Sequence, residues 1–155
     1  MKRIALISLM LLTSTSYAAD WKAVGLDVDN QRATLVNLAT RSDGRFWMAK
    51  VNGNPQSDWD LVLRYVKVVC GRDYDFQILQ EKYYLLGKQI MAPQPDQTTK
   101  NWADIEWEYY DDYYGFCDKK MKTLGTFKAK NPNELSTKVI KHLKAQKKAT
   151  NDPFL

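Results

Sequence analysis

The 155-residue chain is poor in the residue types that most metal and cofactor sites use, with one histidine, two cysteines and seven glycines. One histidine and two cysteines are too few for a usual zinc site, so we expect no metal centre. The glycines stand singly rather than in a Gly-x-Gly-x-x-Gly fingerprint, which argues against a dinucleotide-binding domain, and no cofactor is expected. At this length, with 45% hydrophobic residues and no internal repeat, the chain suits one folded domain.

Long apolar runs are also missing, apart from a short one near the N-terminus. Lys2 and Arg3 precede the apolar run Ile4–Leu12, and small polar residues lead to Ala18. This run is about half of the roughly 20 residues that span a bilayer, and the order is typical of a secretory signal peptide. We predict cleavage near Ala18 and a periplasmic or secreted protein without stable membrane insertion. No cysteine lies directly after the cut, so no lipid anchor is expected.

Cys70 and Cys117 are the only cysteines and both follow the predicted signal peptide. In an oxidising compartment such a pair predicts one disulfide. A redox-active site would favour a Cys-x-x-Cys pair, which is absent, so we interpret this bond as structural.

The middle of the chain has the alternation and turn residues of antiparallel strands. We predict strands over Trp21–Gly25, Gln31–Leu38, Arg45–Val51, Trp59–Cys70, Asp73–Leu86 and Gln89–Met91. In the strand over residues 73–86, one face is expected to carry Tyr74, Phe76 and Ile78, and the other Asp75, Gln77 and Glu81. Residues 92–100 contain two prolines and are expected to form a loop.

The C-terminal region predicts a helix. Asn131 is a candidate N-cap, Pro132 suits the first helical position and Glu134 follows three residues after the cap, so a helix should run to about Lys148. Its apolar stripe consists of Leu135, Val139, Ile140 and Leu143. The spacing of aromatic residues over 108–119 indicates a second helix that carries Cys117, whereas residues 102–107 fit a strand or a helix.

The expected fold is therefore α+β, with an antiparallel β-sheet packed against helix, one disulfide and a basic C-terminal helix. We divide the chain into a signal peptide (1–18), an α+β domain (19–130) and a basic helix and tail (131–155), which is either docked on the domain or partly independent.

An acidic and aromatic stretch is the first candidate binding surface, because tyrosine and tryptophan are common at binding hot spots. A basic partner would suit it, although its rings could equally fill the core. A pair such as Asp104 and Glu106 could also hydrolyse a cell-wall glycan; we consider this alternative weaker. The stretch comprises Trp102, Asp104, Glu106, Trp107, Glu108, Tyr109, Tyr110, Asp111, Asp112, Tyr113 and Tyr114.

The lysines of the C-terminal helix are the second candidate surface, for anionic lipids, cell-wall polymers or heparin-like glycans. Nucleic acid is not an expected partner of an exported protein. His142 lies among these lysines, and we expect a solvated helix residue there rather than a catalytic base. The predicted basic patch consists of Lys138, Lys141, Lys144, Lys147 and Lys148.

Several of these features occur in the same order in a known family. A long strand ending in Cys70 is followed by Tyr83-Tyr84-Leu85-Leu86-Gly87-Lys88, a proline loop, Trp102 and Tyr113-Tyr114-Gly115-Phe116-Cys117, and the strand around Trp47 is similar too. Over residues 20 to 120 the chain resembles the surface-adhesin protein E-like family of small exported bacterial proteins. The resemblance implies a short antiparallel sheet against helix, joined cysteines and binding of host matrix and plasma proteins such as vitronectin and laminin.

These observations predict a non-enzymatic exported binding protein, adhesin-like by resemblance, whose partner is a protein or a cell-envelope polymer. The alternative is a periplasmic inhibitor or accessory factor of an envelope enzyme such as a lysozyme.

Overall fold

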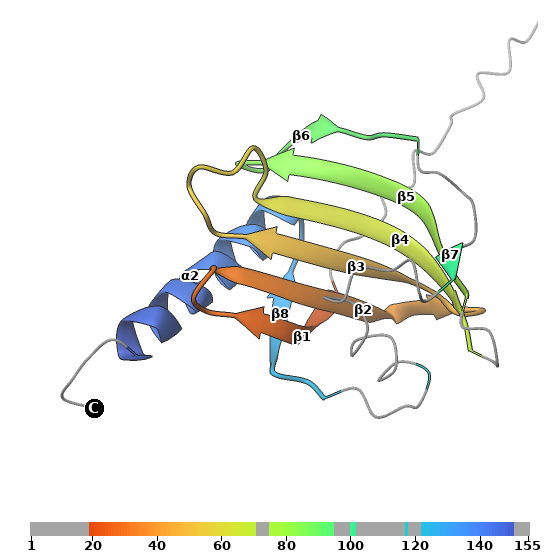
Figure 1. The fold of residues 1–155 in the computed structure, drawn as a ribbon, viewed down its shortest axis with the longest axis horizontal. Coiled ribbons are helices and arrows are strands. Elements are labelled where there is room, and N and C mark those ends of the chain that lie inside the picture. The colour runs from red at the N-terminus through yellow and green to blue at the C-terminus, as the bar shows by residue number, and fades with distance from the viewer. Residues whose placement is uncertain (1–18, 71–74, 95–99, 102–116, 118–121, 151–155) are drawn as a thin grey trace, which may run out of the picture.

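The computed structural model describes residues 19–70, 75–94, 100–101, 117 and 122–150, and all structural statements below concern these residues. They form one antiparallel sheet and one long helix (Figure 1). The strands follow the order β6-β5-β4-β3-β2-β1-β8, and β7 pairs with β5. The elements are β1 (Ala19–Asp27), β2 (Arg32–Ser42), β3 (Arg45–Asn52), β4 (Leu61–Val69), β5 (Asp75–Leu85), β6 (Lys88–Met91), β7 (Lys100–Asn101), β8 (Gly125–Ala129) and α2 (Pro132–Thr150).

The α+β architecture is confirmed, and so are the six strands predicted between residues 21 and 91. β5 and β6 are joined by a two-residue turn in which Leu86 and Gly87 both have positive φ values, 51° and 78°. This is the backbone that a type I′ hairpin turn requires. A Cβ atom on Gly87 would also lie 2.6 Å from the Cβ of Asn133, so the turn contacts the first turn of α2. Glycine is therefore required at this position for two separate reasons.

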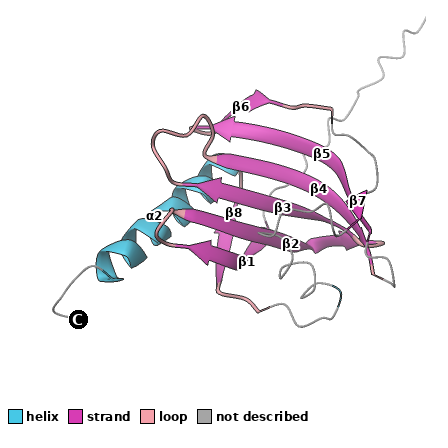
Figure 2. Ribbon diagram, in the orientation of Figure 1, coloured by secondary structure: helices cyan, strands magenta, loops and turns pink. Residues whose placement is uncertain are grey.

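One face of the sheet buries the apolar stripe of α2. Leu135, Val139 and Leu143 are at most 1% exposed, and Ile140 is partly buried beside them. The sheet contributes residues from β1, β2, β3, β4, β5 and β8 to the same cluster, among them Trp21 and Tyr84. Figure 2 shows α2 against one face of the sheet. Residues of β8, at one edge of the sheet, and of the β5–β6 turn, near the other edge, both contact α2, so the sheet curves around the helix. The C-terminal helix is thus docked on the domain. No helix among the described residues is long and apolar enough to cross a membrane.

The opposite face of the sheet carries a second apolar cluster. Val36, Phe46, Met48, Val66, Val68 and Phe76 are all at most 5% exposed. Cys117 packs against this cluster and is bonded to Cys70, just after the end of β4, with a Cα–Cα distance of 5.5 Å. The predicted disulfide is therefore confirmed. It connects two positions 47 residues apart at the second face of the sheet.

The expected placement of Glu81 opposite Ile78 is wrong. Ile78 pairs with Val66 and Glu81 pairs with Arg64, and these two β4 residues share a face because they are two positions apart. An irregularity between the two pairs inserts one extra residue into β5, so Glu81 lies on the same face as Ile78.

The bulge allows Glu81 to form an ion pair with Arg64 that is largely buried, since the two side chains are 13% and 22% exposed. Burial of Arg64 would by itself lower its pKa, but the hydrogen bond and the charge of Glu81 outweigh this effect, and the net pKa of Arg64 is raised. The guanidinium is therefore a fixed positive charge at the rim of the second apolar cluster.

Our sequence analysis missed β8. Its five residues alternate between less exposed and exposed positions, but the run is short and only Ala129 is fully buried. The strand is held by pairing with the first half of β1. The predictions for residues 102–116 lie outside the described residues.

The disulfide gives a first prediction. Closing a loop of 47 residues should restrict the unfolded chain by about 4 kcal/mol in the chain-entropy model. We expect the Cys70→Ser, Cys117→Ser double variant to lose about this free energy of unfolding in urea titrations under oxidising conditions. The wild type in dithiothreitol is the matched control and should unfold like the variant. Equal stability of the oxidised wild type and the variant would contradict the prediction.

The ion pair gives a second prediction. Glu81→Gln leaves the guanidinium of Arg64 buried without its counter-charge, and breaking such a pair should cost about 3 kcal/mol of unfolding free energy. The double variant Arg64→Met, Glu81→Leu removes both charges and should be destabilised less than Glu81→Gln. Chemical denaturation of the three proteins checks this order, and a double variant less stable than the single one would refute it.

Candidate functional site

The described residues bring most of the predicted basic patch together on α2. Lys138, Lys141, Lys144 and Lys148 are exposed, and Lys147 is half-buried. Two of these lysines make contacts within the protein: Lys138 Nζ donates to Glu134 and to the backbone oxygen of Lys128, and Lys147 Nζ donates to the backbone oxygen of Asp29 at 2.9 Å. Lys141, Lys144 and Lys148 make no hydrogen bond or ion pair with the described residues.

The helical repeat explains this arrangement. Residues three, four and seven positions apart share a helix face, so Lys141, Lys144 and Lys148 lie side by side. The apolar stripe is turned into the sheet, and these three lysines therefore face solvent. We refer to Lys141, Lys144 and Lys148 as the lysine face.

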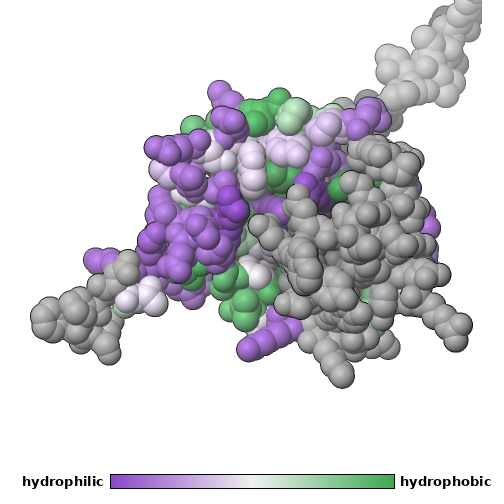
Figure 3. All heavy atoms as spheres, viewed as in Figure 1, coloured by the Kyte–Doolittle hydropathy of each residue, from purple (hydrophilic) through white to green (hydrophobic). Residues whose placement is uncertain are grey.

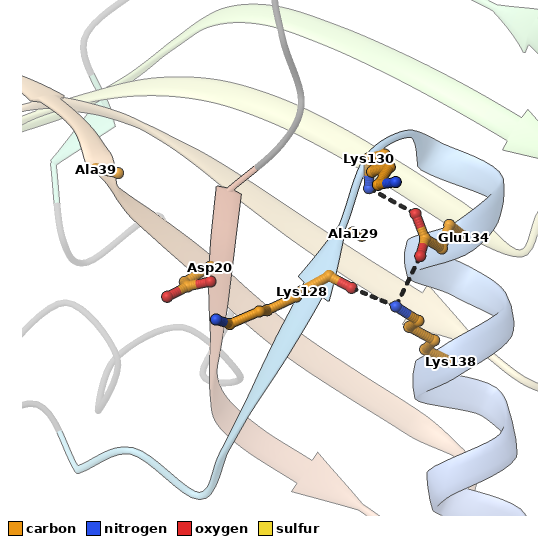
Figure 4. Close-up of a pocket in the computed structure, with 7 residues that line it drawn as sticks. All are labelled: Asp20, Ala39, Lys128, Ala129, Lys130, Glu134 and Lys138. Atoms are coloured by element: carbon orange, nitrogen blue, oxygen red, sulfur yellow. Dashed lines mark hydrogen bonds and ion pairs between the residues drawn. The ribbon is translucent and has the colours of Figure 1, made fainter.

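A second basic feature lies where β1, β8 and the start of α2 meet. An open hollow of about 540 Å³ is lined by Lys128, Lys130, Lys138, Asp20 and Glu134, with Ala39 also at its wall (Figure 4). The three lysines come from β8, from the residue after it and from the second turn of α2. Side chains more than 100 positions apart in the sequence thus share one concave surface. We call this surface the lysine hollow.

The capping contacts of α2 fix one wall of the hollow, as the dashed lines in Figure 4 indicate for Glu134. The backbone N–H of Glu134 donates to Asn131 Oδ1 at 2.8 Å, which confirms Asn131 as the N-cap. Glu134 Oε2 accepts from the backbone N–H of Lys130, and its Oε1 accepts from Lys138 Nζ, both at 2.7 Å. The hydrogen bonds from Lys138 and Lys130 hold the pKa of Glu134 below its usual value.

The charges of the hollow leave a positive excess. Glu134 is paired with Lys138, and Asp20 pairs with Lys128 across the two strands in the register of the sheet. The side chain of Lys128 points toward Asp20 in Figure 4. Lys130 forms no ion pair with a lining residue, although its charge contributes to the lowered pKa of Glu134. The three lining lysines outnumber the two carboxylates, so an anion is the ligand that the hollow suits.

The sequence analysis included Lys138 in its basic patch. It did not predict that Asp20, Lys128 or Lys130 would be part of a binding site. The Asn131–Glu134 capping box was the one local signal for this region, because it fixes where α2 begins. The proximity of Asp20 depends on the pairing of β1 with β8, for which the sequence has no clear pattern.

His142 is not the solvated residue that we expected. It is half-buried, its ring packs edge-on against Phe127 with centroids 5.3 Å apart, and its Nε2 is buried without a hydrogen-bond partner. These contacts make it a packing residue between α2 and β8. No group of three or more histidine, cysteine, aspartate or glutamate side chains within the described ranges could hold a metal ion.

An apolar edge is the other exposed feature. Leu86, Ile90 and Met91 are 81%, 51% and 51% exposed along β6 and its turn. In Figure 3 hydrophobic residues gather along the upper rim, over β6. β6 is short and its pairing with β5 is irregular between Tyr83 and Tyr84. Both features make it harder for a strand of another molecule to pair with this edge of the sheet.

The predicted acidic and aromatic site, residues 102–114, lies outside the described residues. Comparisons with known proteins add no assignment: no family model matches the chain, and no curated protein matches it.

The cap gives a third prediction. Because the folded-state pKa of Glu134 is lowered, its carboxylate stabilises the fold above the usual carboxyl pKa, and this contribution is lost as the pH falls through the folded-state value. Glu134→Gln should therefore lower Tm between pH 6 and pH 8, and the difference from wild type should shrink below about pH 4. A Tm difference that stays constant down to pH 2, measured by circular dichroism, would contradict this mechanism.

Proposed function

We propose that this chain is an exported, non-enzymatic binding protein that holds a polyanionic glycan on the lysine face. The observation that carries the proposal is the set of three exposed lysines on one side of a docked helix, none of which is neutralised by a described residue. Residues 122–150 contain eight lysines and a single acidic residue, so the charge of the protein is concentrated at this end. Such a concentration attracts anions from a distance and raises their association rate.

Several other polar and ionisable side chains are used in contacts within the protein, which favours binding over catalysis as the role of the lysine face. Arg64 is paired with Glu81, Lys138 with Glu134, and His142 is packed against Phe127. These groups are used to hold strands and helix together. The three ammonium groups of the lysine face, in contrast, make no hydrogen bond or ion pair with the described residues.

The family resemblance supports a more specific version of the proposal. In the surface-adhesin protein E-like family the resemblance implies an antiparallel sheet against helix with joined cysteines, and the chain has both features. We therefore propose an adhesin-like role in which the glycan belongs to host matrix, or to the bacterial envelope if the protein stays in the periplasm. Both sources offer sulfate, phosphate or carboxylate groups in repeated arrays, which is the chemistry that a row of lysines binds.

The test is binding to heparin as a defined polyanionic glycan. We expect the triple variant Lys141→Gln, Lys144→Gln, Lys148→Gln to bind about tenfold more weakly, because three surface charge contacts of about 0.5 kcal/mol each are lost. Glutamine keeps the helix propensity close to that of lysine. Affinities are measured by isothermal titration calorimetry at two salt concentrations, and the wild type should lose more affinity in high salt than the variant.

The matched control removes three positive charges from another part of the protein. Lys22, Arg45 and Lys88 are exposed and lie outside residues 122–150, and their replacement by glutamine should weaken heparin binding much less. Equal losses in the two triple variants would show that net charge alone drives binding and would overturn the proposal. Retention of full affinity by the α2 variant would overturn it as well.

A further inference from the structure

The first described residue of β1 directly follows the predicted cleavage site. The signal-peptide pattern predicts a cut after Ala18, and β1 starts at Ala19. Cleavage there would create a free α-amino group on Ala19, the first described residue of β1. The position of this group in the fold is therefore defined by the strand pairing.

That position is at the lysine hollow. Ala19 pairs with Ala129 and Asp20 pairs with Lys128, so the start of β1 lies beside the end of β8. Asp20 and Ala129 both line the hollow, and Figure 4 shows Asp20 at the start of β1, across the hollow from Glu134. The backbone nitrogen of Ala19 belongs to the residue next to Asp20 and opposite Ala129. A charge on this nitrogen would lie beside two of the lining residues, Asp20 and Ala129.

We propose that removal of the signal peptide completes a phosphate-binding site in the lysine hollow, formed by the new α-ammonium group of Ala19 together with Lys130 and Lys128. The inference rests on the export that the proposed function assumes, but it concerns a different surface from the lysine face. The complete site would therefore exist only after the signal peptide has been removed.

The charges explain why cleavage matters. In the uncleaved chain the hollow has three lysines and two carboxylates, an excess of one positive charge. An α-amino group is mainly protonated at pH 7, so cleavage raises the excess to two. Glu134 forms an ion pair with Lys138, and Asp20 lies opposite Lys128 in the strand register. The remaining excess of two positive charges matches the two charges of a phosphate monoester.

The shape of the site favours a small anion. The volume of about 540 Å³ is ample for a phosphate group, and its donors come from both sides, β1 on one and the β8–α2 connection on the other. An ammonium group supplies several N–H donors to phosphate oxygens. The phosphate would be a free ion or a terminal group on a larger envelope molecule, and the first is the simpler probe.

The experiment compares two forms of the chain that begin at Ala19, one with a free α-amino group and one acetylated there. Inorganic phosphate is titrated at pH 7 while the backbone amides of Asp20 and Lys130 are followed by NMR. We expect phosphate to shift these amides in the free form and to bind about fivefold more weakly after acetylation, the effect of losing one charge contact. Lys130→Gln should cause a similar loss, and Lys22→Gln on the same strand should cause none.

Three results would overturn the inference: equal phosphate affinity of the free and acetylated forms, amide shifts located away from the hollow, or a mature protein from the native host that begins at a residue other than Ala19 by mass spectrometry. Heparin affinity measured on the same two forms separates this inference from the proposed function. Acetylation should leave heparin binding within about twofold, because the lysine face is unchanged. A failure of heparin binding in both forms would count against the proposed function alone.

Discussion

Burial of the apolar stripe of α2 inside the curved sheet is the contact on which the other features depend. Leu135, Val139 and Leu143 are almost fully buried, and each should contribute about 2 kcal/mol. Because these side chains determine which way the helix is turned, they also determine that Lys141, Lys144 and Lys148 face solvent. The same docking brings the first turns of α2 next to β8 and β1, where the lysine hollow forms. The core and both basic surfaces thus follow from one helix orientation.

Because the sheet has an apolar cluster on each face, its central strands must bury side chains on both sides. In β4, Leu61, Val62 and Leu63 are all buried, so the usual alternation of apolar and polar residues is lost there. Arg64 interrupts this run, and it is tolerated because the bulge in β5 turns Glu81 toward it. The disulfide acts on this second face, at the end of the sheet where Val68 and Phe76 are buried. The two faces are therefore held by different means, a docked helix on one and a covalent bond at the other.

Local patterns were enough to predict most of the fold. Alternation in residues 31–51 and the capping box at Asn131 are encoded within a few positions, and the strands and helix followed from them. The features that were missed depend on distant residues. β8 forms because β1 offers it a partner, and the side of the sheet on which Glu81 lies depends on one extra residue in β5. The lysine hollow joins residue 20 to residues 128–138, and no periodicity in a sequence can indicate such a contact.

The two basic surfaces differ in how much selectivity they can provide. Along α2, Lys141 and Lys148 are separated by about 10 Å at a rise of 1.5 Å per residue, and the helix holds their backbones at this spacing. Their ammonium groups are flexible, strongly hydrated point charges, so the lysine face should respond mainly to charge density and to salt. The hollow instead sets its lysines beside two carboxylates, Asp20 and Glu134, which would repel a poorly placed anion. Selectivity among anionic ligands should therefore come from the hollow, and general attraction from the helix.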